Sequence, residues 1–376
     1  MSTRSVVVLL IVALSLAVMV LLFEREVGRE VEPGPDEYKV FKAYAKDQVK
    51  LVNLVRGDLT VQLVRQGQGW QMTLPVRAAA ANKQVEKLLE QLGGLMEVAR
   101  PVKVPAGEKI NLEQYGLSNP WGKIIVTYGG VTGAQLSLGQ RTREHNQVYA
   151  RLGKENRVMV IDAKAMKLLE EVAADKNFYR SRRIFQERHL DRALTIELVS
   201  RQAPAGKSIL LGKEQSSGRW LLTSPVKDRA DGEAVRELLD KCAELRVAEF
   251  ILNIEQMTTA EQAKLAQMLE LYGLTGRGEA GAVAVEAGGM HVVVYLGRAD
   301  KQGKLRYALV ENRAVLSGTQ ELVKIEAGFA EVLPRSVEAL RDRRFLTFEG
   351  QAVSELRISG PEGEIVLGQG RSSEAR

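Results

Sequence analysis

The sequence contains few of the residues that build metal centres and disulfide bonds. Its 376 residues include one cysteine, Cys242, and three histidines. A single cysteine excludes an intramolecular disulfide and a cysteine-based zinc site. The histidines, at positions 145, 189 and 291, lie far apart and form no local ligand pair. We therefore expect no metal and no cofactor.

The motifs of the common catalytic sites are also missing. There is no P-loop, no H-E-x-x-H and no G-x-S-x-G, which are local signatures of phosphate, zinc and acyl-transfer chemistry. A G-x-G-x-x-G match runs from Gly276 to Gly281, but a predicted strand at 282–286 follows it instead of a helix, which favours an ordinary loop. Acids such as Glu170 and Glu171 are typical of a solvated helix face. We expect no enzymatic activity.

Long blocks of one charge are absent as well. The 53 basic and 47 acidic residues are interspersed, so the net charge of +6 describes a mixed surface. Nucleic-acid-binding domains gather their basic residues into a patch or stripe, and we therefore expect no nucleic-acid partner. Apolar content of 45% is ordinary for globular domains, and the length suggests two or three of them.

A long apolar run is present near the N-terminus. The 18 residues from Val6 to Phe23 carry no charge, and as a helix they span about 27 Å, enough to cross a bilayer core. The run ends in Leu21-Leu22-Phe23 without the small residues of a cleavage site, so an uncleaved signal anchor is favoured over a signal peptide. A buried core helix is disfavoured because the run is apolar on all sides.

The charges around this run bear on its orientation. Arg4 and the terminal amine favour a cytoplasmic N-terminus, whereas Arg25 and Arg29 on the far side oppose it. A tail of five residues is easily left in the cytoplasm. We therefore expect a single-pass protein of the bacterial inner membrane, with the bulk of the chain in the periplasm or otherwise outside the cytoplasm.

One stretch occurs twice and organises the rest of the sequence. A tryptophan is followed five residues later by a proline, as Trp70 and Pro75 in the first copy and Trp220 and Pro225 in the second. Both pairs are 150 residues apart (220 − 70 and 225 − 75). Self-similarity at a fixed period indicates two units built from one ancestral domain.

Each copy predicts a strand followed by a helix. Alternation places Trp70, Met72 and Leu74 on one face of the strand, and we expect both repeated tryptophans in the core. In the second helix Cys242 takes the place of Leu92, which favours a small core residue over a reactive thiol.

The other elements follow the same plan in both units. Strands are predicted at 49–55, 59–64, 123–128, 134–138, 282–286 and 291–296, and helices at 82–92 and 231–245. Predicted helix starts are the caps Asp162 and Asp231 and the capping boxes Thr258-x-x-Glu261 and Ser317-x-x-Gln320.

Three short motifs recur in the same order. They are Tyr-Gly-Leu at 115–117 and 272–274, Leu-Gly at 138–139 and 296–297, and Tyr-Ala at 149–150 and 307–308. The glycine of each Tyr-Gly-Leu motif is predicted to be left-handed.

Each unit ends in an arginine-rich elbow, at 179–185 and at 340–346. Arg182, Arg183, Arg343 and Arg344 are the candidates for contact with an acidic partner or with anionic lipid. Their recurrence is also consistent with a structural role, in which they cap helix ends or pair with acids of the same unit. We favour the structural role.

The predicted fold is α+β: an N-terminal transmembrane helix followed by tandem α/β repeat units with mainly antiparallel sheets. The expected parts are an anchor at 1–23, a linker at 24–46, a first unit at 47–184, a second unit at 185–345, and a partial third unit or cap with a loose tail at 346–376.

The anchor, the tryptophan strand, the Tyr-Gly-Leu turn, the Leu-Gly and Tyr-Ala motifs and the Leu340-Arg-Asp-Arg-Arg344 elbow together resemble the bacterial domain of unknown function 4340 family. The second unit departs from the pattern, because it lacks the proline that follows the first Tyr-Gly-Leu as Pro120 and has Thr275-Gly276 after its own copy. The resemblance implies a membrane-tethered envelope protein without an assigned activity. It also implies an accessory role, because genes of the family often lie beside ABC transporters of the gliding-motility or auxiliary type.

These features point to three functions, in order of preference. The first is a membrane-anchored, non-enzymatic scaffold or accessory subunit of an ABC-type transporter complex. The second is an extracytoplasmic module that binds an envelope polymer or a small ligand. The third is a hydrolase.

Overall fold

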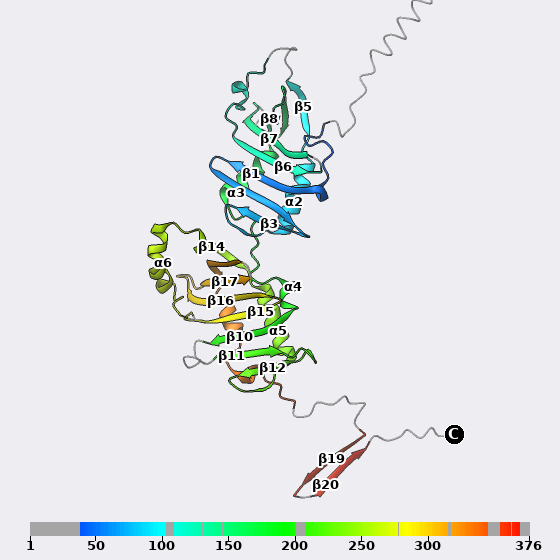
Figure 1. The fold of residues 1–376 in the computed structure, drawn as a ribbon, viewed down its shortest axis with the longest axis vertical. Helices are drawn as coiled ribbons and strands as arrows, with labels where there is room; N and C mark the ends of the chain where they lie inside the picture. The colour runs from blue at the N-terminus through cyan, green and yellow to red at the C-terminus, as the bar shows by residue number, and fades with distance from the viewer. Residues whose placement is uncertain are drawn as a thin grey trace, which may run out of the picture. The chain divides into compact units, whose positions relative to one another are not determined.

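The structure of the protein is a computed structural model (Figure 1). It describes residues 38–102, 109–129, 131–143, 146–200, 208–276, 278–314, 317–344, 354–361 and 363–368. The predicted anchor at 1–23 lies outside these residues, and no helix within them is long and apolar enough to cross a membrane. Contacts divide the chain into Met1–Ser181 and Arg182–Arg376, so the division falls three residues before the predicted one.

The first unit is built on a nine-stranded sheet in which each pairing is antiparallel. Its strands are β1 (Val49–Arg56), β2 (Leu59–Gln66), β3 (Gly69–Leu74), β4 (Ala78–Ala79), β5 (Glu97–Val102), β6 (Gly122–Tyr128), β7 (Val131–Arg141), β8 (Gln147–Leu152) and β9 (Val158–Asp162). They lie in the order β4-β3-β2-β1-β6-β7-β8-β9-β5. The predicted turn between β1 and β2 is present, and Gly57 adopts the positive φ of 56° that such a turn requires.

Two helices complete the core of the first unit. Helix α2 (Asn82–Gly93) buries the four residues of its predicted apolar face, Val85, Leu88, Leu89 and Leu92. Helix α3 (Lys164–Ala174) buries its own apolar residues in the same cluster. The carboxylate of Asp162 accepts a hydrogen bond of 2.8 Å from the first amide of α3, as the sequence predicts.

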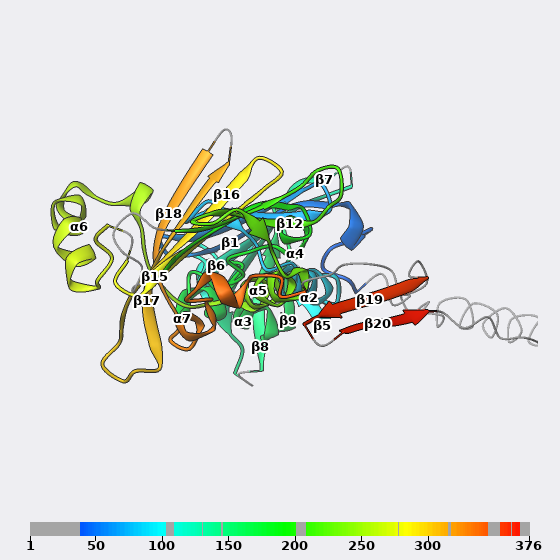
Figure 2. The same cartoon turned by 90° about the horizontal axis from the view of Figure 1, so that it is seen from below.

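The second unit repeats the sheet in the order β13-β12-β11-β10-β15-β16-β17-β18-β14. Its strands are β10 (Ala193–Ser200), β11 (Ile209–Lys213), β12 (Trp220–Ser224), β13 (Asp228–Arg229), β14 (Val247–Asn253), β15 (Gly281–Ala287), β16 (Met290–Ala299), β17 (Leu305–Ala314) and β18 (Ser317–Glu326). Its helices are α4 (Glu187–Leu190), α5 (Gly232–Glu244), α6 (Thr259–Leu271) and α7 (Phe329–Val332). Figures 1 and 2 both place α6 away from α5. Two tandem α+β units with antiparallel sheets are therefore confirmed.

The repeated motifs meet in space within each unit. Gly116 and Gly273 adopt φ values of 66° and 67°, which confirms the predicted left-handed turns. A Cβ atom on Gly139 would lie 2.1 Å from the carbonyl oxygen of Tyr115, and one on Gly297 would lie 2.2 Å from that of Tyr272. The second residue of the Leu-Gly motif is therefore a glycine because the Tyr-Gly-Leu turn packs directly on its backbone.

The tyrosines of these motifs also contact one another. The rings of Tyr115 and Tyr149 are 5.0 Å apart at their centroids, and those of Tyr272 and Tyr307 are 3.9 Å apart. They belong to small apolar clusters that lie beside the main cores. The repetition of these motifs thus has a packing explanation.

Two local predictions are wrong. Ser317 does not open a helix, because Ser317–Glu326 is a strand that pairs along its length with β17 and buries Leu322 and Ile325. Sheet pairing overrides the capping pattern there, whereas the predicted box at Thr258 and Glu261 is present. Leu74 is 44% exposed, because a register shift in the β2–β3 pairing interrupts the alternation that buries Trp70 and Met72.

A hairpin follows the nine-stranded sheet of the second unit along the chain. Strands β19 (Glu355–Gly360) and β20 (Gly363–Gly368) form a two-stranded antiparallel sheet (Figure 2). The sequence predicts this hairpin as the opening of a partial third unit. Its apolar side chains Ile358, Ile365 and Leu367 are more than half exposed.

Candidate functional site

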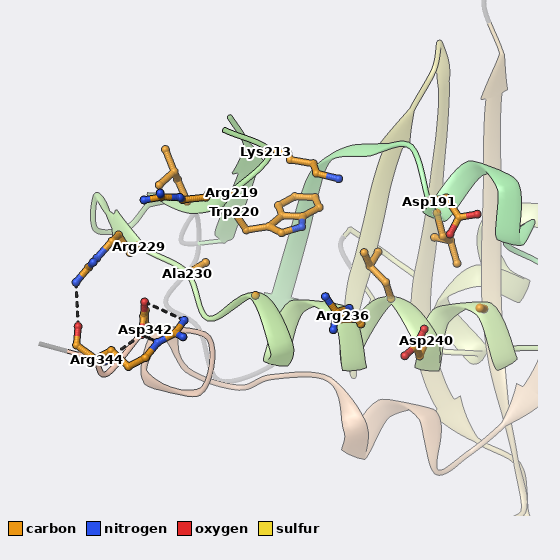
Figure 3. Close-up of a pocket in the computed structure, with 16 residues that line it drawn as sticks. Asp191, Lys213, Arg219, Trp220, Arg229, Ala230, Arg236, Asp240, Asp342 and Arg344 are labelled. Atoms are coloured by element: carbon orange, nitrogen blue, oxygen red, sulfur yellow. Dashed lines mark hydrogen bonds and ion pairs between the residues drawn. The ribbon is translucent and has the colours of Figure 1, made fainter. Parts of the chain in front are cut away.

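A cleft of about 790 Å³ opens in the second unit, where β11 and β12 lie opposite helix α5 (Figure 3). We call it the Trp220 cleft. Its lining includes Trp220 and Leu239, the cationic side chains Lys213, Arg219, Arg229, Arg236 and Arg344, and the acids Asp191, Asp240 and Asp342. Cationic groups therefore outnumber acidic groups, and an indole ring lies among them.

Trp220 is only partly buried and packs against the core of the second unit, so its predicted place in the core is confirmed in part. Lys213 is its direct partner across β11 and β12, and the Lys213 ammonium nitrogen lies 5.8 Å from the centroid of the indole ring. This distance is within the range of a cation–π interaction. The pair forms one wall of the cleft (Figure 3).

The second elbow forms another part of the wall. Asp342 accepts a hydrogen bond of 3.0 Å from Nε of Arg344, and this contact holds the pKa of the Asp342 carboxyl below its usual value. Arg229 donates from Nη2 to the carbonyl oxygen of Arg344 at 2.9 Å. The backbone amide of Asp342 in turn donates to the carbonyl of Arg229 at 3.0 Å, so the elbow is fixed to β13.

Helix α5 lies along the opposite side. Its N-cap Asp231 accepts hydrogen bonds from the amides of Glu233 and Ala234, so the helix start is satisfied by its own chain. Arg236, one turn further on, contacts both carboxylate oxygens of Glu233 at 3.0 Å. That ion pair is exposed, and Figure 3 shows Arg236 on the side of α5 that faces Trp220.

The first unit contains the same backbone arrangement. The amide of Ala81 donates to the carbonyl of Tyr179 at 2.8 Å, and the amide of Asp231 donates to the carbonyl of Leu340 at the same distance. Trp70 has a cationic cross-strand partner as well, Arg65, whose guanidinium carbon lies 4.7 Å from the ring centroid. Residues of the two units that lie 150 positions apart can therefore be compared one by one.

The comparison shows why the cleft opens beside Trp220. In the first unit, the side chain of Asn82 accepts a hydrogen bond from the amide of Trp70 at 3.0 Å, and Trp70 is only 5% exposed. The second unit has Gly232 in the place of Asn82. Nothing lies within 4 Å of the position that a Cβ of Gly232 would take. The loss of one side chain therefore leaves space next to the second tryptophan.

The charge of this region has also changed between the units. Three arginines of the cleft have uncharged or acidic counterparts 150 residues earlier: Arg219 stands for Gly69, Arg229 for Ala79 and Arg236 for Glu86. A guanidinium group binds carboxylate or phosphate with two parallel hydrogen bonds. The second unit thus has guanidinium groups at three positions where the first has none, while Glu233, which pairs with Arg236, stands for Lys83.

The four predicted contact arginines are not gathered into one site. Arg182 donates to the carbonyls of Val247 at 3.3 Å and Ala248 at 2.7 Å, which ties it to the start of β14. Arg183 forms a backbone bridge with Arg246. These contacts are consistent with a structural role for the first pair.

The two arginines of the second pair, Arg343 and Arg344, have different surroundings. Arg343 makes a hydrogen bond of 3.5 Å to the carbonyl of Glu338, whereas Arg344 lines the Trp220 cleft. Only Arg344 of the four predicted residues therefore belongs to the cleft. Contact of the other three with a partner or with lipid stays a prediction.

The other residues considered from the sequence have contacts that are consistent with a role in the fold. Cys242 is fully buried, and burial raises the pKa of its thiol to about 12, so the nucleophilic thiolate is disfavoured. Glu170 pairs with Arg141 at 3.2 Å. The glycine-rich loop that ends at Gly281 leads into β15, as predicted. Within the described ranges, no group of three or more His, Cys, Asp or Glu residues could hold a metal ion.

Sequence reasoning missed most of the cleft. Its arginines are scattered over 126 positions from Arg219 to Arg344 (344 − 219 + 1), and none forms a recognised motif. The available signal was the difference between the two copies at a spacing of 150 residues.

A comparison with protein families gives a match in two tandem segments. The family described as Domain of unknown function (DUF4340) matches residues 70–219 and again residues 220–375. The two matches begin at Trp70 and Trp220, inside the sheets of the two units. No curated protein and no solved structure matches the chain. Because the two matches cover most of the sequence, the chain belongs to the DUF4340 family.

Proposed function

We propose that this protein is a membrane-anchored, non-enzymatic envelope protein that serves as an accessory or scaffold subunit of an ABC-type transporter complex. The observation that carries the proposal is the uncharged run from Val6 to Phe23 in front of two folded units. Its length suits a single span of the bacterial inner membrane, with the units outside the cytoplasm. The transporter association follows from the family resemblance.

The non-enzymatic part of the proposal has support from particular residues. The thiol of Cys242 is held in the protonated form by burial. The repeated tyrosines and glycines, which recur like motif residues of a site, pack against one another within each unit. These contacts give the repeated residues a packing role.

A second candidate function is an extracytoplasmic ligand-binding module. The Trp220 cleft favours it, because its space and three of its arginines are features of the second unit that the first unit lacks. The two functions are compatible, since an accessory subunit can carry a ligand to a transporter.

The test of the first function is affinity purification of the full-length protein from its native membrane in mild detergent, followed by mass spectrometry. We expect an ABC-type permease or ATPase among the recovered proteins. Recovery of the protein without any membrane partner would contradict the accessory role.

A control for the anchor uses the double variant Leu14→Asp and Val18→Asp. A charged residue near the middle of a span disfavours insertion by about 2.5–3.5 kcal/mol. We expect the wild-type protein to remain in alkali-washed membranes and the variant to leave them. Release of the wild-type protein by alkali would contradict an uncleaved anchor.

A further inference from the structure

The Trp220 cleft has cationic groups available for a ligand. Lys213 and Arg219 have no side-chain ion pair within the part of the chain that the structure describes. Asp342, one of the three acids of the cleft, is already bound to Arg344. The balance of charge therefore favours a ligand that carries negative groups, and arginine is suited to carboxylate or phosphate.

The indole of Trp220 adds a flat apolar surface to this polar cleft. The C–H face of a sugar ring can bury apolar area against an indole while its hydroxyl groups remain hydrated or bond to polar side chains. The ammonium of Lys213 lies over the same indole. The described lining contains one aromatic residue, Trp220. The cleft is therefore a poor match for a nucleobase, which would be held between two aromatic side chains.

The size and polarity of the cleft are consistent with a sugar. Its volume of about 790 Å³ lies within the usual range of ligand pockets, about 300–1,000 Å³. Eight of the residues that line it are charged, which disfavours an apolar ligand such as an acyl chain. A ring with hydroxyl groups and one or more anionic groups can contact both the indole and the arginines.

We propose that the Trp220 cleft binds an anionic saccharide, that is, a sugar ring carrying a phosphate or carboxylate group. This inference rests on the second candidate function and names its ligand class. It is independent of the transporter association. Arg219 binds the anionic group together with Arg236, which exchanges its exposed ion pair with Glu233 for the ligand, and Trp220 packs against the ring. The first unit, with Glu86 and Gly69 at the corresponding positions, does not bind this ligand.

The experiment is calorimetric titration of the full-length protein in detergent micelles. The probes are glucose 6-phosphate, glucuronic acid, glucose, inorganic phosphate and adenosine monophosphate. We expect at least one of the two anionic sugars to bind at least tenfold more tightly than glucose, inorganic phosphate or adenosine monophosphate. The two anionic probes distinguish phosphate from carboxylate as the recognised group.

Substitutions in the cleft and a control outside it test whether the ligand binds in the cleft. Arg236→Glu introduces the acid that the first unit has at this position, and we expect it to weaken binding at least tenfold. Lys264→Glu, on the exposed surface of α6, makes the same change of charge and should leave affinity within twofold. Trp220→Leu should weaken binding, whereas Trp220→Phe should retain part of it. Thermal unfolding shows whether each variant is folded.

Several results would overturn the proposal. They are binding of no anionic sugar, equally tight binding of inorganic phosphate, tighter binding of adenosine monophosphate, or equal losses in Arg236→Glu and Lys264→Glu. Each would leave the accessory role untouched, because that role is tested by recovery of a membrane partner. Conversely, a failed purification would not affect the sugar titration.

Discussion

Lys213 and Trp220 are direct partners across two neighbouring strands, with the lysine ammonium 5.8 Å from the centroid of the indole ring. The first unit repeats this relationship with Arg65 and Trp70, where the distance is 4.7 Å. A cation beside a cross-strand tryptophan is therefore common to both copies. The surroundings differ, because Trp70 is buried and Trp220 lines a cleft.

This difference predicts unequal effects of removing the two indoles. Trp70→Ala should destabilise the first unit by about 3–5 kcal/mol, the usual range for a buried tryptophan. Trp220→Ala should destabilise the second unit by less, because its side chain is only partly buried beside the core. Urea unfolding of the full-length variants measures the loss of unfolding free energy. Hydrogen exchange of the amides in each unit assigns that loss to the first or the second unit. Equal losses would contradict the open cleft.

The N-terminal caps of α2 and α5 predict opposite effects on stability for two substitutions. Asp231 caps α5 through its side chain, whereas its counterpart Ala81 makes no side-chain cap. Asp231→Ala should therefore destabilise the second unit by about 1 kcal/mol, and Ala81→Asp should stabilise the first by about 0.5–1 kcal/mol. Hydrogen exchange of the first-turn amides of each helix is the measurement. A stabilising effect of Asp231→Ala would contradict the cap.

The contact between the Tyr-Gly-Leu and Leu-Gly motifs predicts that Gly139 and Gly297 do not tolerate a side chain. A Cβ at either position would overlap a backbone oxygen, so each alanine variant should lose about 1–3 kcal/mol or more of its unit's unfolding free energy. Gly328→Ala is the control, since nothing lies within 4 Å of its Cβ position. Similar stabilities of Gly297→Ala and Gly328→Ala would show that the described contact is wrong.

The ion pair of Asp342 and Arg344 predicts an acid-sensitive contact at the cleft. Hydrogen bonds from Arg344 lower the pKa of Asp342 in the folded protein below its ordinary value of 3.8. A carboxyl whose folded pKa is lowered adds stability above its unfolded pKa and loses it as the pH falls through the folded value. The pair should therefore persist at pH 7 and break in acid.

Carboxyl-carbon NMR of Asp342 checks this prediction. The titration midpoint should lie below 3.8 in the wild type and rise in Arg344→Gln. Arg335→Gln, which removes an arginine of the same unit outside the cleft, should leave the midpoint unchanged. A midpoint that does not respond to Arg344→Gln would show that another group sets the pKa.

Local sequence patterns predicted most strands of the first unit and helices α2, α3, α5 and α6, but they did not predict strands β5, β10, β11 and β14. Hairpins and amphipathic helices depend on near neighbours, as in the turn at Gly57 and the apolar face of α2. Ser317 was predicted wrongly because its role depends on pairing with β17, which a local pattern does not contain. Leu74 was predicted wrongly because a register shift is a property of two strands together.

The cleft could not be predicted from any single motif. It depends on the absence of a side chain at Gly232 and on arginines from β13, α5 and the second elbow. Only the fold brings these residues together. The repeat did carry part of the information, because the exchange of Glu86 for Arg236 is visible once the two copies are aligned.

The proposed ligand site distinguishes the two tryptophans, because Trp220 lines a cleft and Trp70 is buried. The most direct measurement is ¹⁹F NMR of the full-length protein labelled with fluorotryptophan, since the three tryptophans give three resonances. Titration with glucose 6-phosphate and with glucuronic acid should shift the Trp220 resonance saturably with at least one of them and leave that of buried Trp70 unchanged. Equal shifts of Trp70 and Trp220, or no shift of Trp220 with either sugar, would contradict a ligand site at Trp220.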